Sequence, residues 1–129
     1  MSKFKSQNVI KTFKNAGRGV RITVKAEKNI KIHIVMAVLV IIAALLLKMD
    51  VTKICILIIA ISNVMVAEFI NTSLEFGLDA VFKNKYSRLV GMAKDISAGA
   101  VVVASVFSAI IGLLLFGNEI FKLIKNAML

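Results

Sequence analysis

The sequence predicts an all-α integral membrane protein with three transmembrane helices and an N-terminal amphipathic surface helix. Its composition is 59% hydrophobic and only 19% charged, and its mean hydropathy is +0.89. About a quarter of the residues in a soluble domain are charged, so most soluble classes are excluded. The apolar residues also fall in long runs. A chain of 129 residues then forms a single domain, residues 1–129, with little room for a separate catalytic domain.

Three apolar stretches define the expected spans: residues 30–47, residues 54–70, with a helix continuing to about residue 79, and residues 96–116. At 1.5 Å per residue, about 20 helical residues cross the roughly 30 Å hydrocarbon core. Lipid offers the backbone no hydrogen-bond partner, and the stretches lack the alternation of barrel strands. We therefore expect each stretch to be a helix.

The connections and the charges predict the topology. Residues 48–53 allow only a tight turn, whereas the second connection is expected to run from about residue 80 to residue 93. The first 31 residues carry nine Lys or Arg against a single acid, Glu27, and the second connection is also basic. With three crossings these two segments share a side, which the positive-inside rule makes cytoplasmic.

The N-terminal segment, residues 1–29, is expected to be an interfacial helix. Its apolar residues recur at helix-like intervals between lysines: Phe4, Val9, Ile10, Phe13, Ala16 and Val20. Such a helix places its apolar face in the headgroup region and its basic face toward phosphates. Gly17 and Gly19 are expected to bend or interrupt it. Membrane electrostatics account for the basic charge, so no nucleic-acid partner is predicted.

A polar ridge enters the second span. Glu68, Asn71, Glu75 and Asp79 lie at i, i+3, i+7 and i+11, which places them on one stripe of a helix. Charged residues within spans are costly and usually mark functional sites. The alternative is that Asp79 and Glu75 are simply hydrated residues at the helix end. Glu68 does not fit that alternative, because its sequence neighbours are apolar.

These groups suit phosphoryl transfer. A carboxylate removed from water can act as a general base, and spaced carboxylates can hold magnesium and, through it, phosphates. Lys94 and Asp95 precede the third span, and Glu27 precedes the first, all on the inferred cytoplasmic side. No phosphate-loop motif is present in the sequence, which excludes the usual soluble kinase folds. His33 is interpreted as an interfacial or packing residue, with metal ligation as the less favoured alternative.

The sequence resembles the small prokaryotic membrane lipid kinases, the diacylglycerol kinase and undecaprenol kinase family. The resemblance covers nearly the whole chain and rests on three segments in order. They are Glu27-Lys-Asn-Ile-Lys-Ile-His33, the run from Glu68 through Asn71-Thr72 to Glu75 and Asp79, and Ala93-Lys94-Asp95-Ile-Ser-Ala-Gly-Ala-Val101. The Gram-positive branch favours Glu-x-Asn-Phe-x-Ile-His at the first segment, with Ile30 replacing Phe here, so the undecaprenol kinase branch is preferred.

The resemblance implies a homotrimer whose active sites are shared between neighbouring subunits. It implies that Glu68 is the general base and that Asn71 orients groups beside it. It assigns Glu27 and Glu75 to magnesium and to the ATP phosphates. The remaining nucleotide-binding residues would be Lys94, Asp95, Lys85, Tyr86 and Ser87.

The expected function is therefore ATP- and Mg²⁺-dependent phosphorylation of a lipid alcohol at the bacterial cytoplasmic membrane. Undecaprenol is the favoured acceptor, and diacylglycerol is the alternative. The motifs concern phosphate chemistry and discriminate poorly between a prenol and a glyceride. A hypothesis of a different class is a non-enzymatic small membrane or transport protein, in which the acidic ridge carries ions or protons.

Overall fold

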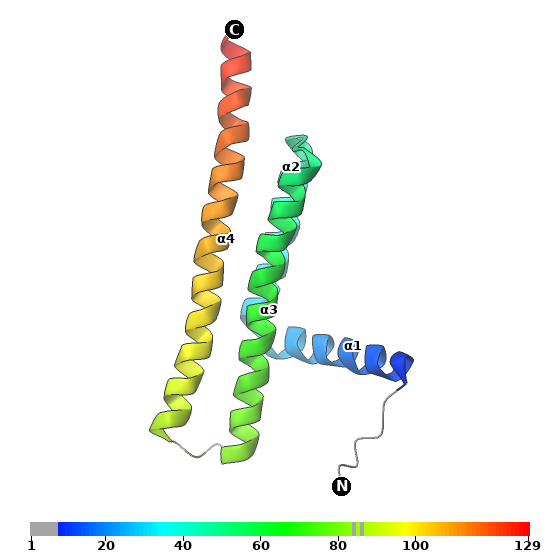
Figure 1. The fold of residues 1–129 in the computed structure, drawn as a ribbon, viewed down its shortest axis with the longest axis vertical. Helices are drawn as coiled ribbons and strands as arrows, with labels where there is room; N and C mark the ends of the chain where they lie inside the picture. The colour runs from blue at the N-terminus through cyan, green and yellow to red at the C-terminus, as the bar shows by residue number, and fades with distance from the viewer. Residues whose placement is uncertain (1–7, 84, 86) are drawn as a thin grey trace.

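The computed structural model describes residues 8–83, 85 and 87–129, and this part of the chain forms four helices. They are α1 (Val9–Ala26), α2 (Lys28–Leu46), α3 (Val51–Phe82) and α4 (Arg88–Met128). Figure 1 shows α2, α3 and α4 running alongside one another while α1 projects sideways from the bundle. Phe4 and Tyr86, both named above, lie outside the described residues.

The helices α2, α3 and α4 are each long and apolar enough to cross a membrane, which confirms the predicted fold class. Their lengths are 19, 32 and 41 residues. At 1.5 Å per residue, α3 is about 48 Å long and α4 about 61 Å, well above the roughly 30 Å of a hydrocarbon core. Both helices therefore continue beyond the apolar stretches that identified them.

The second connection is shorter than expected. The expectation of a connection over about residues 80–93 is wrong, because α3 reaches Phe82 and α4 begins at Arg88. Lys83 ends α3 in a left-handed conformation with φ of 50°. Lys94 and Asp95 consequently lie on α4. The physical reason is that basic residues mark where a span ends but do not end a helix, and residues 80–82 and 88–93 include Ala, Leu, Met and Arg, which have good helix propensity.

The tight turn between α2 and α3 is confirmed. The Asp50 side chain caps α3 by accepting a hydrogen bond from the backbone N–H of Lys53 at 3.1 Å. Just before it, Met49 packs with Ala44 and Leu57 in a small buried cluster. The cap and the cluster hold α2 and α3 as antiparallel neighbours.

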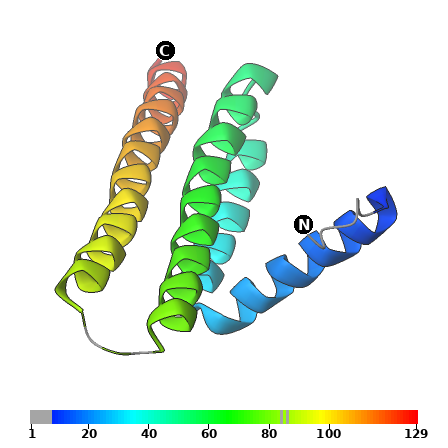
Figure 2. The same cartoon turned by 60° about the horizontal axis from the view of Figure 1, so that its bottom comes forward.

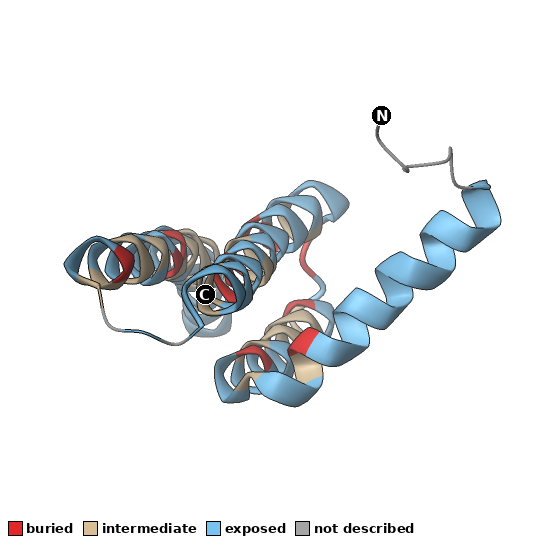
Figure 3. Cartoon of the chain, turned by 90° about the horizontal axis from the view of Figure 1, so that it is seen from below, coloured by how far each residue is buried: buried red, intermediate tan, exposed pale blue. Residues whose placement is uncertain are grey.

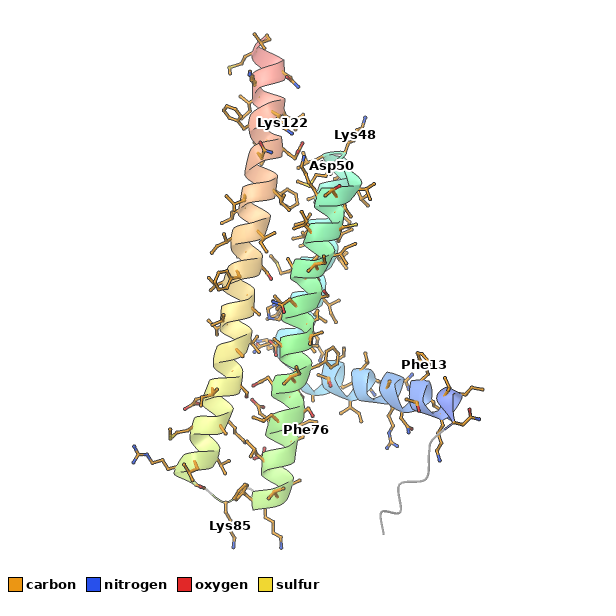
Figure 4. The ribbon with its side chains drawn as sticks, in the orientation of Figure 1. Phe13, Lys48, Asp50, Phe76, Lys85 and Lys122 are labelled. Atoms are coloured by element: carbon orange, nitrogen blue, oxygen red, sulfur yellow. The ribbon has the colours of Figure 1, made fainter. Side chains whose placement is uncertain are left out.

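Helix α1 is continuous through Gly17 and Gly19, so the expected bend or break there is wrong. Glycine in a helix costs only about 1 kcal/mol relative to alanine, which does not by itself end the helix. The chain changes direction instead at Glu27, the single residue between α1 and α2 (Figure 2). Its backbone is extended, with φ −104° and ψ 122°. In Figure 4, Phe13 projects from the side of α1 that faces the end of the bundle with Lys48 and Asp50.

Most of the bundle is exposed or only partly buried (Figure 3), and many of the exposed residues are large and hydrophobic. Large side chains such as Leu39, Phe107 and Leu113 are more than half exposed. A single chain in water would not tolerate this much exposed apolar area, since such patches mark contacts with lipid or with other proteins. The outer surface therefore agrees with a membrane environment.

An ion cluster joins the α2–α3 turn to α4 at the end of the bundle remote from α1. Lys53 contacts both Asp50, at 2.8 Å, and Glu119, while Lys122 lies 3.5 Å from Glu119. Figure 4 shows Asp50 and Lys122 at this same end. All four residues lie outside the apolar stretches. The hydrogen bond from Lys53 lowers the pKa of Asp50 and is also the main cause of the lowered pKa of Glu119.

A carboxyl group whose folded-state pKa is lowered stabilises the fold above its unfolded pKa of about 4, and this contribution is lost as the pH falls through the folded value. Glu119→Gln should therefore lower the melting temperature by a few degrees at pH 7. At pH 3 it should have less effect, because this pH lies below the ordinary pKa of a carboxyl group and part of the contribution is already lost. The check is thermal unfolding in detergent micelles at both pH values. Lys125→Gln, which alters an exposed residue outside the cluster, is the control. An equal effect at both pH values would contradict the prediction.

Candidate functional site

The polar ridge of α3 faces α4, and two hydrogen bonds between the helices and one within α3 define it. Asn71 Nδ2 donates to Glu75 Oε1 at 3.1 Å, one turn further along α3. Ser97 Oγ donates to Asn71 Oδ1 at 2.5 Å, and Lys94 Nζ donates to Asp79 Oδ1 at 2.6 Å. These five residues, three from α3 and two from α4, form what we call the polar seam.

The short loop accounts for the pairing. Because only residues 83–87 separate α3 from α4, the two helices pack as an antiparallel hairpin. Residues of α3 and α4 at similar distances from the loop then lie opposite each other. Lys94 and Ser97 are three residues apart and share one face of α4, so one contacts Asp79 near the loop and the other contacts Asn71 further away.

Both ends of the Asn71 amide are used, which fixes its orientation. Its oxygen accepts from Ser97 and its nitrogen donates to Glu75. Asn71 is buried, with 9% of its surface exposed. The next residue, Thr72, is 1% exposed, and its Oγ1 has no hydrogen-bond partner among the described residues. In the sequence, Thr72 stands out only as part of the Asn71-Thr72 motif.

Glu68 lies at the inner end of the ridge and is only 3% exposed. His33 Nε2 of α2 lies 3.3 Å from Glu68 Oε1. The interpretation of His33 as a mere interfacial or packing residue missed this contact. A usable signal was present, since His33 precedes the α2–α3 turn by nearly as many residues as Glu68 follows it. The two side chains are therefore at a similar depth in an antiparallel pair.

The ridge runs from the level of α1 outward. Figure 4 places Phe76 of α3 below α1, and both α3 and α4 continue further to the loop that carries Lys85. Asp79 therefore lies still further out, and its side chain is 40% exposed. Glu68 lies about two helical turns back toward the interior. If α1 lies along a membrane surface, the ridge begins near that surface and extends into water.

The other predicted nucleotide residues are not joined to the seam by any described contact. Glu27 is partly buried at the junction of α1 and α2, and none of its described contacts reaches Glu75. Asp95 is exposed on α4. Lys85 lies in the loop and Ser87 at the N-terminus of α4, with Tyr86 between them outside the described residues.

A closed metal site is not found: among the described residues, no group of three His, Cys, Asp or Glu side chains could hold a metal ion. Glu75 and Glu27 each offer a single carboxylate. Magnesium commonly binds through one or two carboxylates together with substrate phosphates and water. The donor set therefore fits a metal ion that arrives with a nucleotide and does not fit an all-protein cage.

An apolar groove of about 700 Å³ begins beside the ridge, between α2, α3 and α4. His33 lines one end of it, and Ile120 lines the other. Most of the remaining lining is aliphatic, including Val40, Leu57 and Val64. His33 thus connects the apolar groove with the buried carboxylate of Glu68.

Fold and site together define a class: an all-helical protein with three potential membrane spans and an acidic, lysine-containing site at one end. Residues 14–116 match the prokaryotic diacylglycerol kinase family. An undecaprenol kinase of Bacillus subtilis is 37% identical over 106 residues, which cover 82% of this chain and 85% of that protein. A diacylglycerol kinase of Synechocystis is 34% identical over 105 residues, covering 81% of this chain and 60% of that protein. The chain belongs to the prokaryotic diacylglycerol kinase family.

The seam predicts a stability effect. Ser97→Ala should destabilise the protein by about 1 kcal/mol, because the buried Asn71 oxygen loses its donor. Ser97→Thr retains the hydroxyl and should lose less. Unfolding titrations with SDS in mixed micelles measure the difference. Ser105→Ala on the same helix is the matched control. If Ser97→Ala and Ser105→Ala destabilise equally, the hydrogen bond to Asn71 contributes nothing specific.

Proposed function

We propose that this protein is an ATP- and Mg²⁺-dependent kinase of a membrane lipid alcohol, with undecaprenol as the favoured acceptor and diacylglycerol as the alternative. Family membership supports the reaction class. The higher identity and fuller coverage of the undecaprenol kinase relative support the acceptor. The observation that carries the proposal is Glu68, a buried carboxylate placed between an apolar groove and a seam that contains an amide, acids and a lysine.

Glu68 is proposed as the general base. Its carboxylate accepts the proton of the lipid hydroxyl while the hydroxyl oxygen bonds to the γ-phosphorus of ATP. The bond between that phosphorus and the bridging oxygen breaks, and ADP leaves. Phosphoryl transfer of this kind depends mainly on positioning and charge stabilisation. The groove beside His33 offers an apolar surface for part of the lipid chain, which would bring the hydroxyl toward Glu68.

The seam is proposed to bind the nucleotide phosphates. Lys94 has three N–H donors, so it can keep its contact with Asp79 and still donate to a phosphate oxygen. Glu75, whose Oε1 is held by Asn71, and Glu27 are the proposed magnesium ligands, and Asp95, Lys85, Tyr86 and Ser87 complete the proposed nucleotide contacts. Magnesium bound with ATP would offset the charge of the phosphates.

The site is proposed to be shared between subunits of a homotrimer. No described contact joins Glu27 to Glu75 within one chain, and the outer faces of the three long helices are largely exposed. A neighbouring copy could bring the missing groups together and cover part of that surface. We place the protein in a bacterial cytoplasmic membrane with its N-terminus and site on the cytoplasmic side. The basic N-terminal segment supports this orientation.

The direct test is transfer of labelled γ-phosphate from ATP by purified protein in mixed micelles. Undecaprenol and diacylglycerol are compared at matched mole fraction, with and without magnesium. Faster phosphorylation of undecaprenol supports the proposal in full. Preference for diacylglycerol overturns the acceptor. Transfer to neither would return the non-enzymatic membrane protein to first place.

Glu68→Gln should reduce kcat at least about 100-fold, because the amide cannot accept the hydroxyl proton. ATP binding should be retained, since Glu68 is not a proposed nucleotide contact. Labelled-phosphate transfer and nucleotide titration measure the two quantities separately. Glu119→Gln, the same exchange in the remote ion cluster, is the matched control and should keep its turnover. Full turnover in Glu68→Gln would show that another group is the base.

Glu75→Gln and Glu27→Gln should each weaken binding of magnesium-ATP about tenfold, the loss expected for one charged ligand. The loss should be much smaller for ATP titrated without magnesium, because the carboxylates act through the metal. Titration of a fluorescent ATP analogue at fixed and at zero magnesium checks both arms. An unchanged affinity in the presence of magnesium would remove that glutamate from the metal site.

A further inference from the structure

The contact between His33 and Glu68 is the least expected feature of the site. His33 Nε2 lies 3.3 Å from Glu68 Oε1 and brings α2 into a ridge that otherwise belongs to α3 and α4. The Glu68 side chain is 4% exposed and that of His33 is 28% exposed. Among the described residues, this is the one ion-pair contact of Glu68, and no hydrogen bond to its carboxylate is found. The carboxylate is therefore held from one side.

A carboxylate away from water is costly unless a hydrogen-bond donor or a charge accompanies it. The imidazole Nε2–H can serve as that donor in one neutral tautomer and in the cation. An imidazole N–H directed at Oε1 would restrict the rotation of the carboxylate and leave Oε2 available. Such restriction matters for a base, because proton transfer requires the acceptor oxygen within hydrogen-bond reach of the hydroxyl.

The fold keeps His33 in place. Ile30, nearly one turn earlier on α2, has no exposed surface and anchors the start of that helix. His33 also lines the apolar groove at its inner end, so a hydroxyl arriving along the groove meets the imidazole and the carboxylate together. His33 thus belongs both to the groove wall and to the contact with the proposed base, Glu68.

We infer that His33 is a positioning residue for the lipid-phosphorylation step, and that its imidazole N–H orients Glu68 for proton transfer from the lipid hydroxyl. This inference rests on the proposed function. It adds α2 to the site and gives His33 a role beyond that of an interfacial or packing residue.

The first test compares two replacements of His33. His33→Ala removes the donor and should lower kcat about tenfold or more, with the KM for ATP unchanged. His33→Gln supplies an amide N–H of similar reach and should recover kcat to within about threefold of the parent protein. A residue that merely fills space would not distinguish a donor from an apolar group of similar size, so His33→Leu should be as slow as His33→Ala. His33→Leu also serves if His33→Ala does not fold.

Val35→Ala on the same helix is the control, since Val35 is exposed and does not line the groove. It should leave kcat unchanged. Gel filtration in detergent verifies that each variant is folded.

The second test is a double-mutant cycle. If His33 acts through Glu68, His33→Ala should have almost no further effect on the residual rate of Glu68→Gln. Multiplying losses would mean that the two residues act independently and would overturn the inference, as would a wild-type kcat in His33→Ala. Failure of the proposed function looks different, because the parent protein would then phosphorylate neither undecaprenol nor diacylglycerol.

Discussion

The constraint on which the structure depends is that hydrocarbon supplies no hydrogen-bond partners. Backbone groups must be satisfied within each segment, so the apolar stretches form helices. The same constraint acts on side chains: the polar groups that enter α3 need partners on neighbouring helices. Glu68 is paired with His33, and Asn71, just beyond the apolar stretch, is paired with Ser97. The site is therefore also a set of contacts that fixes how α2, α3 and α4 pack.

Different interactions hold α3 and α4 together at the two ends of the pair. At the remote end, Lys53 and Glu119 form a partly buried ion cluster whose strength depends on pH. At the other end, the polar seam combines a lysine with neutral hydrogen bonds near the loop. Between them the helices contact mainly through aliphatic side chains, with one further hydrogen bond from Ser108 to the carbonyl of Ala60. Ion pairs thus lie at both ends of the hairpin, and at the end near the loop they adjoin the buried amide of Asn71.

Sequence reasoning predicted the three spans, the tight turn and the single stripe formed by Glu68, Asn71 and Glu75, because hydropathy and helical period encode them directly. It placed the second connection too broadly, because charged residues end a span without ending a helix. It also missed the partner of Glu68. Helix α2 is apolar around most of its circumference, so its sequence does not encode which face turns toward α3. The rotation of α2, and with it the direction of His33, required the assembled structure. The assignments to magnesium, ATP and the trimer remain predictions.

The single extended residue between α1 and α2 constrains the length of the chain. An insertion within a helix turns everything beyond it by about 100° per residue. An added residue beside Glu27 would double this one-residue link or extend one of the helices by about 100° of rotation, and either change would redirect α1 relative to Ile30 and His33. An insertion in the loop of residues 83–87 need not rotate α3 or α4, because lengthening a loop costs little free energy. Insertions should therefore be tolerated better in the loop between α3 and α4 than beside Glu27, where a single inserted residue would reorient the surface helix.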